Sequence, residues 1–421
     1  MSKGLTLLPE PLRIADFRFY WLARLTSTIA QMAMVIVIGW QVYDIARETM
    51  GLKEAAFRLG IIGLVQFLPL FALTLVTGWA ADRVDRRWIA RASVALELGC
   101  AGILGILAYR GTTTLPALYT VAALLGVARA FAGPALGALA PNLVPREILP
   151  RAIALSSIAW QTGAILGPAV GGYLYAWSPF APYAGSAALF AVALLSLFAI
   201  RPVKRPEIDR GPNPWAQMVE GLSYVRRNRL VLGAISLDLF AVLLGGATAM
   251  LPVFARDVLH SGPEGLGHLR AAPAVGATLT ALFFSIRPLK TNVGMKMLVA
   301  VGAFGAATIL FGLSRTMPLS LACLAVLGAA DMLSVYVRQS LIQLYTPDSM
   351  RGRVGAVSSL FISASNELGE AESGFVGALI GPVASVIAGG VGAIVIVVIW
   401  AWKFPELRRA RTFDVPTEET G

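Results

Sequence analysis

Acidic side chains near the end of the chain carry the clearest chemistry. Glu367 and Glu370 are three positions apart, so a helix places them on one face, with Asn366 adjoining and Glu372 pointing elsewhere. Two carboxyl groups close together in a low dielectric resist being ionised at the same time. We therefore expect at least one to hold a proton near neutral pH and to release it when the site opens to water. The alternative is a fixed acid, hydrogen-bonded or paired with an arginine, that holds helices together.

Other ionisable residues also interrupt long apolar runs, where each is costly and therefore a functional candidate. For Asp238, a proton or substrate site and a structural ion pair are both open interpretations. Arg24 and Arg338 lie near the ends of their runs, where we expect snorkelling or salt bridges. Glu97 and Arg270 are weaker candidates of the same type.

The sequence offers little for other chemistries. It shows no metal-ligand cluster, nucleotide-binding loop or nucleophile–base arrangement, and it has only two histidines. We expect no metal and no cofactor, and neither an enzyme nor an ATP-driven pump. Cys100 and Cys323 fall inside apolar runs, where we interpret them as small hydrophobic residues rather than a disulfide.

Composition indicates a membrane protein. Hydrophobic residues make up 57% and charged residues 14% of the 421 residues, against about 25% charged in a typical soluble domain. The net charge of +11 would suggest nucleic acid in a soluble protein. Here the positive residues sit in short loops, as membrane topology requires. We therefore expect the lipid bilayer as a partner and no nucleic acid.

Runs of about 20 apolar residues can each cross the hydrocarbon core as a helix. Twelve such runs predict an all-α membrane protein; they lie near 20–43, 56–80, 89–109, 116–139, 152–176, 181–200, 230–254, 265–287, 296–314, 318–341, 355–379 and 383–402. An even number of spans puts both termini on one side of the membrane. Because most loop lysines and arginines fall on that side, we expect both termini in the cytoplasm.

The stretch 145–172 is repeated at 347–374, a shift of 202 positions that places Arg151 on Arg353 and Gly167 on Gly369. A duplication of about half the chain suggests two similar bundles related by an axis along the membrane normal. We expect an N-terminal six-helix bundle at 1–200, a cytoplasmic linker at 201–229, and a C-terminal six-helix bundle with a short tail at 230–421. Within the linker, 215–225 is predicted to form a short amphipathic helix on the membrane surface.

Three motifs carry a family resemblance. The loop after the second run holds Gly78, Asp82, Arg83, Arg86 and Arg87, and it resembles the signature loop of the major facilitator superfamily, except that Asp85 stands where that family commonly has glycine. Arg129, Gly133 and Gly137 are similar to its fourth-span motif. The fifth span resembles the motif that marks its proton-coupled exporters, with Gly163, Gly167, Pro168, Gly171 and Gly172. The stretches 237–259, 346–354 and 365–374 are similar to the branch of the enterobactin exporters, also called transmembrane secretion effectors.

The resemblance implies two pseudo-symmetric six-helix bundles that export a bulky, amphiphilic small molecule, such as a siderophore or drug, in exchange for protons. In that architecture Arg129 and Asp331 occupy equivalent places, and we expect both near the mid-depth of a central cavity. We expect a monomer in the cell inner membrane. The open alternatives are an uptake permease on the same fold and a non-transporting receptor or secretion scaffold.

The residues of these motifs also have physical explanations that do not depend on the family resemblance. Asp82 beside three arginines can form a charge-assisted latch on the cytoplasmic side, and the alternative is a loop that is merely positive. The glycines of the fifth span, with Pro168, allow close packing and a bend where the halves can rock. The alternative is helix packing without a role in transport.

Overall fold

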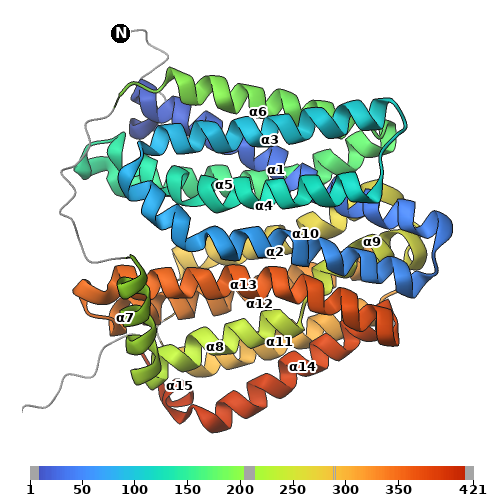
Figure 1. Ribbon diagram of the computed structural model, residues 1–421. Helices are drawn as coiled ribbons and strands as arrows, with labels where there is room; N and C mark the ends of the chain where they lie inside the picture. Colours follow the sequence, from blue (N-terminus) through green and yellow to red (C-terminus); the bar gives the residue numbers. More distant parts are fainter. Residues whose placement is uncertain (1–8, 203–213, 288, 290, 413–421) are drawn as a thin grey trace, which may run out of the picture. The chain divides into compact units, whose positions relative to one another are not determined.

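The computed structural model describes residues 9–202, 214–287, 289 and 291–412, and these form helices and short connections without a β-strand. Figure 1 labels the helices along the chain. The bounds are α1 (Ala15–Thr49), α2 (Leu52–Arg83), α3 (Arg86–Tyr109), α4 (Leu115–Leu139), α5 (Leu149–Trp177), α6 (Ala181–Ala199), α7 (Pro214–Arg227), α8 (Arg229–Leu244), α9 (Leu251–Val253), α10 (Gly262–Ile286), α11 (Val293–Leu313), α12 (Met317–Tyr345), α13 (Asp348–Ile380), α14 (Pro382–Lys403) and α15 (Pro405–Arg409).

Most of the expected spans are present as long apolar helices. Among the described residues, eleven helices are long and apolar enough to cross a membrane, and α8 counts together with the short turns that follow it. The twelfth expected span is α13, a helix of 33 residues that is more polar than the others. Its length is sufficient for a crossing. The acidic residues from Glu367 to Glu372 lower the hydropathy of α13. The span that is least apolar is therefore the one that carries the residues predicted to bind protons.

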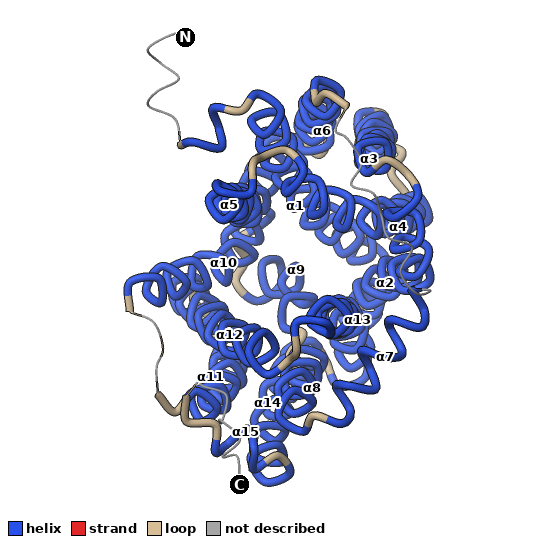
Figure 2. Tube along the Cα trace, turned by 90° about the vertical axis from the view of Figure 1, so that its left-hand side faces the viewer, coloured by secondary structure: helices blue, strands red, loops and turns tan. Residues whose placement is uncertain are grey.

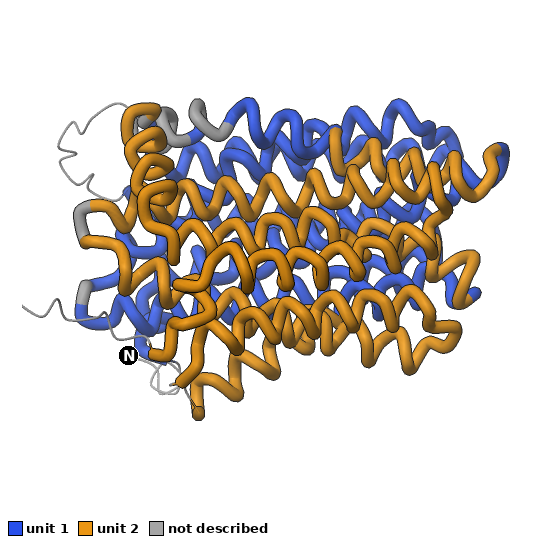
Figure 3. Tube along the Cα trace, turned by 90° about the horizontal axis from the view of Figure 1, so that it is seen from below, with its two compact units in different colours: residues 1–49, 65–211, 260–271 blue, residues 50–64, 212–259, 272–421 orange. Residues whose placement is uncertain are grey.

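The chain forms two compact units, coloured separately in Figure 3. Unit 1 comprises residues 1–49, 65–211 and 260–271, and unit 2 comprises residues 50–64, 212–259 and 272–421. The first part of α2 thus packs in unit 2, and the first part of α10 packs in unit 1. Each unit is held together by contacts between helices that are distant in sequence.

Unit 1 is built around α1, which packs along α5 and α6, while α3 packs on α4 and α6. Figure 2 looks along the helices and shows α5 and α6 beside α1. The start of α3 is set locally, because the Asp85 side chain accepts a hydrogen bond from the Arg87 backbone N–H at 3.0 Å. A carboxylate at this position is also stabilised by the partial positive charge at the N-terminal end of the helix.

Unit 2 has a core in which α8, α11, α12, α14 and α15 meet, with Trp400, Phe404 and Leu407 buried among them. The linker helix predicted at 215–225 is present as α7. Its apolar face packs on the protein, with Val225 buried against residues of α8, α12 and α13. An ion pair of 2.7 Å between Arg353 and Glu220 adds to this contact.

The seventh span is not one continuous helix. The α-helix ends at Leu244, after 16 residues, and Gly245 and Gly246 lead into a short 3₁₀ turn and a π turn that reach Val258. A Cβ atom at Gly246 would lie 2.4 Å from the Gly369 carbonyl oxygen of α13. Glycine is needed here because two backbones touch. Broken helices of this kind mark binding regions in many transporters.

Candidate functional site

The two predicted proton-binding acids lie on α13 within unit 2. Glu367 is 7% exposed, Glu370 is partly buried, and the neighbouring Asn366 is exposed. A Cβ atom at Gly63 of α2 would lie 2.9 Å from the Glu367 carbonyl oxygen and 3.0 Å from Glu370 Cβ. The shared face of the two glutamates therefore meets the first part of α2. Glu372 is turned away from this contact and accepts a hydrogen bond of 3.4 Å from Ser373 Oγ.

Asp238 forms an ion pair, which is one of the two interpretations left open for it. Its carboxylate on α8 pairs with the Arg338 guanidinium on α12, and the two residues are 4% and 2% exposed. Arg338 thus forms a buried salt bridge instead of snorkelling to the membrane surface, which was the open alternative. A buried pair of this kind is costly to break, because removing one partner leaves a buried charge without compensation.

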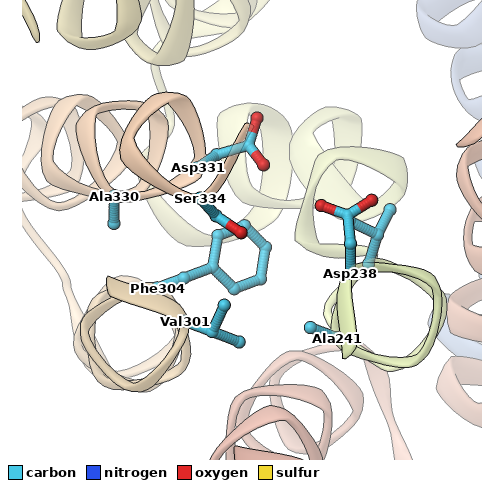
Figure 4. Close-up of a pocket in the computed structure, with 8 residues that line it drawn as sticks. Asp238, Ala241, Val301, Phe304, Ala330, Asp331 and Ser334 are labelled. Carbon is cyan, nitrogen blue, oxygen red and sulfur yellow. The ribbon is translucent and has the colours of Figure 1, made fainter. Parts of the chain in front are cut away.

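Asp331 lines a small cavity beside that pair. The cavity has a volume of about 10 Å³, which is about the room that one water molecule needs. Figure 4 shows the carboxylates of Asp238 and Asp331 on two different helices, with the Ser334 hydroxyl turned toward the space between them. The remaining lining is apolar and comes from Ala241, Val242, Val301, Phe304 and Ala330. Val242 also contacts α13, because a Cβ atom at Gly369 would lie 2.8 Å from its carbonyl oxygen.

Unit 1 contains a separate polar group. Arg129 on α4 donates a hydrogen bond of 2.9 Å to Gln66 on α2, and its charge also acts on Glu97 of α3. Glu97 is fully buried and accepts a hydrogen bond from Gln31, while its Oε2 has no partner among the described residues. Glu97 is a weak candidate from the sequence, yet it is the most completely buried of the acids that the structure describes.

The glycines of the fifth span pack against two different helices. Cβ atoms at Gly163, Gly167 and Gly171 would meet α1, with approaches of 2.7, 2.6 and 3.0 Å. A Cβ atom at Gly172 would instead lie 2.5 Å from the Pro263 carbonyl oxygen at the start of α10. The close packing expected from this motif is therefore present, and Pro168 lies inside the continuous helix α5.

We expect Gly167→Ala to lower the free energy of unfolding of unit 1 by about 1–3 kcal/mol. The added methyl group would lie 2.7 Å from the Ile29 carbonyl oxygen, a backbone atom that cannot turn away. Gly137→Ala on α4 is the matched control, because no atom lies within 4 Å of that position, and its effect should stay within about 1 kcal/mol. Denaturant unfolding of the purified protein in detergent measures both. Equal losses would contradict the packing argument.

The signature loop is described in part. The surroundings of Gly78, Asp82 and Arg83 at the end of α2 lie outside the described side chains, so the proposed role of Asp82 stays a prediction. Arg87 forms an ion pair of 2.6 Å with Asp85 and donates a hydrogen bond to the Ile200 carbonyl. Arg86, which follows Asp85, is partly buried. Asp85, which departs from the family pattern, therefore both caps α3 and orients Arg87, one of the arginines of the motif.

Solved structures share this fold. A bacterial homologue of the human lysosomal transporter Spinster, in an inward-facing and occupied conformation, matches with a TM-score of 0.74 over 97% of this chain and 100% of its own, at 15% identity. The nucleoside transporter NupG matches with a TM-score of 0.69 over 93% and 99% of the two chains, also at 15% identity. The chain is therefore an all-α, multi-pass membrane protein with the major facilitator fold.

The sequence places the chain more narrowly. Residues 8–418 match the transmembrane secretion effector family, and the chain belongs to it. The enterobactin exporter EntS of Escherichia coli O1:K1 is 31% identical over 282 residues, which is 66% of this chain and 66% of the exporter. The match thus spans just under two thirds of that relative. The resemblance seen in the motifs is confirmed, and none of the relatives named here is an enzyme.

Proposed function

We propose that this protein is a secondary active transporter that exports a bulky, amphiphilic small molecule, of siderophore or drug type, in exchange for protons. The observation that carries the proposal is the burial of ionisable side chains within the spanning helices of a secretion effector. Charge placed there is expensive and marks ion or substrate pathways. Glu97, Asp238 and Glu367 are all less than a tenth exposed, and enterobactin export by the relatives supports the direction of transport.

The two halves of the chain, 1–200 and 230–421, would act as the bundles that alternate access, joined by the linker 201–229. Arg129 and Asp331 occupy equivalent positions in the duplicated halves, and in this proposal they bind polar parts of the substrate or bias the conformational change. Glu367 and Glu370 exchange protons. Asp82 with its neighbouring arginines forms the cytoplasmic latch, while the glycines of α5 let neighbouring backbones slide.

The membrane setting is also part of the proposal. We place the protein in the cell inner membrane with both termini in the cytoplasm, because the positive loops favour that side. In this proposal it works as a monomer, with the pathway formed within one chain. Neither a cofactor nor nucleic acid has a role in this scheme.

Transport by the purified protein in liposomes tests the function. Enterobactin and a lipophilic cationic dye serve as probes, and the vesicle lumen is made more acidic than the outside. An exchanger should accumulate a probe while protons leave, and a protonophore should abolish the accumulation. An uptake symporter would accumulate the probe only with the opposite gradient. Movement that ignores the pH gradient in both directions would contradict proton coupling.

A further inference from the structure

The cavity between α8, α11 and α12 brings Asp331, to which the proposed function gives a role, together with Asp238 and Ser334, to which it gives none. Asp331, Ser334 and Arg338 are separated by three and four positions, so they share one face of α12. Asp238 faces them from α8. Two carboxyl groups therefore line one small cavity, and the guanidinium group of Arg338 is paired with Asp238.

Asp331 has no such partner within the described part of the chain. It forms neither a hydrogen bond nor an ion pair with the residues that the structure describes, whereas Asp238 holds Arg338. If both carboxyl groups were ionised, the cluster would carry one negative charge that nothing compensates. Asp331 is only partly exposed and lines a largely apolar cavity, where a carboxyl group without a counter-charge takes up a proton instead.

Ser334 points independently to an occupant. It is 2% exposed, it lines the cavity, and its Oγ forms no hydrogen bond within the described part of the chain. Buried hydroxyl groups are normally satisfied, and an unsatisfied one often indicates an ordered water. The cavity has room for one such molecule, and the two carboxyl groups supply the further polar partners that a buried water requires.

We propose that this cavity is a proton-binding site in which one water molecule links Ser334 to the carboxyl groups, Asp331 carries one exchangeable proton, and Asp238 stays ionised against Arg338. Proton binding converts the Asp331 carboxylate and a hydronium ion into a carboxylic acid and water. A role of this site in transport rests on the proton coupling proposed above. Proton binding at the site does not depend on that coupling.

The size of the cavity favours a proton over a metal cation. Either would bring the cluster to zero net charge, because Asp238, Asp331 and Arg338 together carry one excess negative charge. A metal cation needs several oxygen ligands, whereas the cavity has room for one water molecule, and a proton on Asp331 needs no coordination shell. From the other packed helices, α11 contributes only Val301 and Phe304 to the lining, with Lys296 more than a turn away. The helix α13 contacts α8 at Gly369 and carries Glu367 and Glu370 on either side of that contact.

Two measurements test the site without a transport substrate. The first is infrared difference spectroscopy of the purified protein across a pH titration, which detects the C=O stretch of protonated carboxyl groups. We expect Asp331→Asn to remove one such band. Ser334→Ala should retain the band, but Asp331 should bind its proton about tenfold more tightly, because a hydrogen bond to the ionised form is lost. Ser358→Ala is the matched control, since Ser358 is equally buried and unpartnered but lies outside the cavity.

The second measurement uses the unmodified protein, so it does not depend on whether a variant folds. A hydrophobic carbodiimide reacts with protonated carboxyl groups, and mass spectrometry should locate the adduct on Asp331 and not on Asp238, with less labelling as pH rises. An adduct on Asp238, or a full set of infrared bands in Asp331→Asn, would overturn the proposal. Loss of the band on adding Na⁺ in place of choline would identify a sodium site and overturn it as well.

The outcome separates this inference from the proposed function. If Asp331 binds a proton in a protein that shows no pH-driven transport, the proton-binding site stands and the proposed proton coupling is wrong. If a pH gradient drives transport while Asp331 stays unprotonated, the proton coupling stands and this site is wrong.

Discussion

Replacing Arg338 by methionine should lower the free energy of unfolding of unit 2 by about 3–5 kcal/mol, because it leaves the Asp238 carboxylate buried without a partner. Both residues are buried almost completely, so bulk water cannot replace the charge of the guanidinium group beside Asp238. Denaturant unfolding in detergent, followed by a probe on α8 or α12, measures the loss.

Two companion variants make this result specific. The double replacement Asp238→Leu with Arg338→Met removes both charges, and it should recover most of the stability, since an apolar pair avoids the cost of desolvating the ions. Arg353→Met is the matched control in the same unit. It breaks the more exposed ion pair with Glu220 and should cost about 1 kcal/mol or less. If Arg338→Met and Arg353→Met were equally harmful, the buried pair would not be the source of the effect.

The second large effect concerns transport. We expect Glu370→Gln to abolish accumulation driven by a pH gradient, because glutamine has nearly the same size as glutamate but cannot exchange a proton. Movement of the same probe down its own concentration gradient should continue, since the contact with Gly63 is made by Glu370 Cβ, which glutamine retains. Parallel liposome assays with and without the pH gradient distinguish the two activities.

Glu220→Gln is the control for that experiment, because Glu220 lies on α7 and is half-exposed in its pair with Arg353. It should leave both activities unchanged. Proton-driven accumulation by Glu370→Gln at the normal rate would remove this residue from the mechanism. Loss of both activities would show that Glu370 serves as a structural acid, which was the alternative from the start.

The helices could be predicted well from the sequence because a bilayer leaves few options for a long apolar run. Even α13 was expected, although its acids make it the most polar of the spans. The interruption after Leu244 was not expected, since Gly245 and Gly246 look like ordinary packing glycines within an apolar run. The structure shows why two glycines are placed there: a Cβ atom at Gly245 would meet the Phe304 ring, and one at Gly246 would meet the carbonyl oxygen of Gly369.

The geometry of the site could be predicted less well from the sequence than the fold. Asp238 and Arg338 are separated by a hundred residues, and a single sequence carries no distance between them. The spacing of Asp331, Ser334 and Arg338 on one helix face was visible, but Ser334 gave no signal until its hydroxyl was found buried and unpartnered. Asp85 was similarly ambiguous, because its value as a helix cap depends on where α3 begins.

The broken seventh span has a mechanical consequence. A helix of 16 residues rises about 24 Å, less than the hydrocarbon thickness of about 30 Å, so the segment beyond Leu244 completes the crossing. Swinging that segment relative to α8 would not rupture a regular ladder of amide bonds, since the ladder already stops at Gly245. Resistance to such a swing comes instead from the packing of the segment itself, which includes the contact of Gly246 with the Gly369 carbonyl oxygen and the stacking of Phe254 on Phe311. The stiffness of this span is therefore set by tertiary packing and not by the helix backbone.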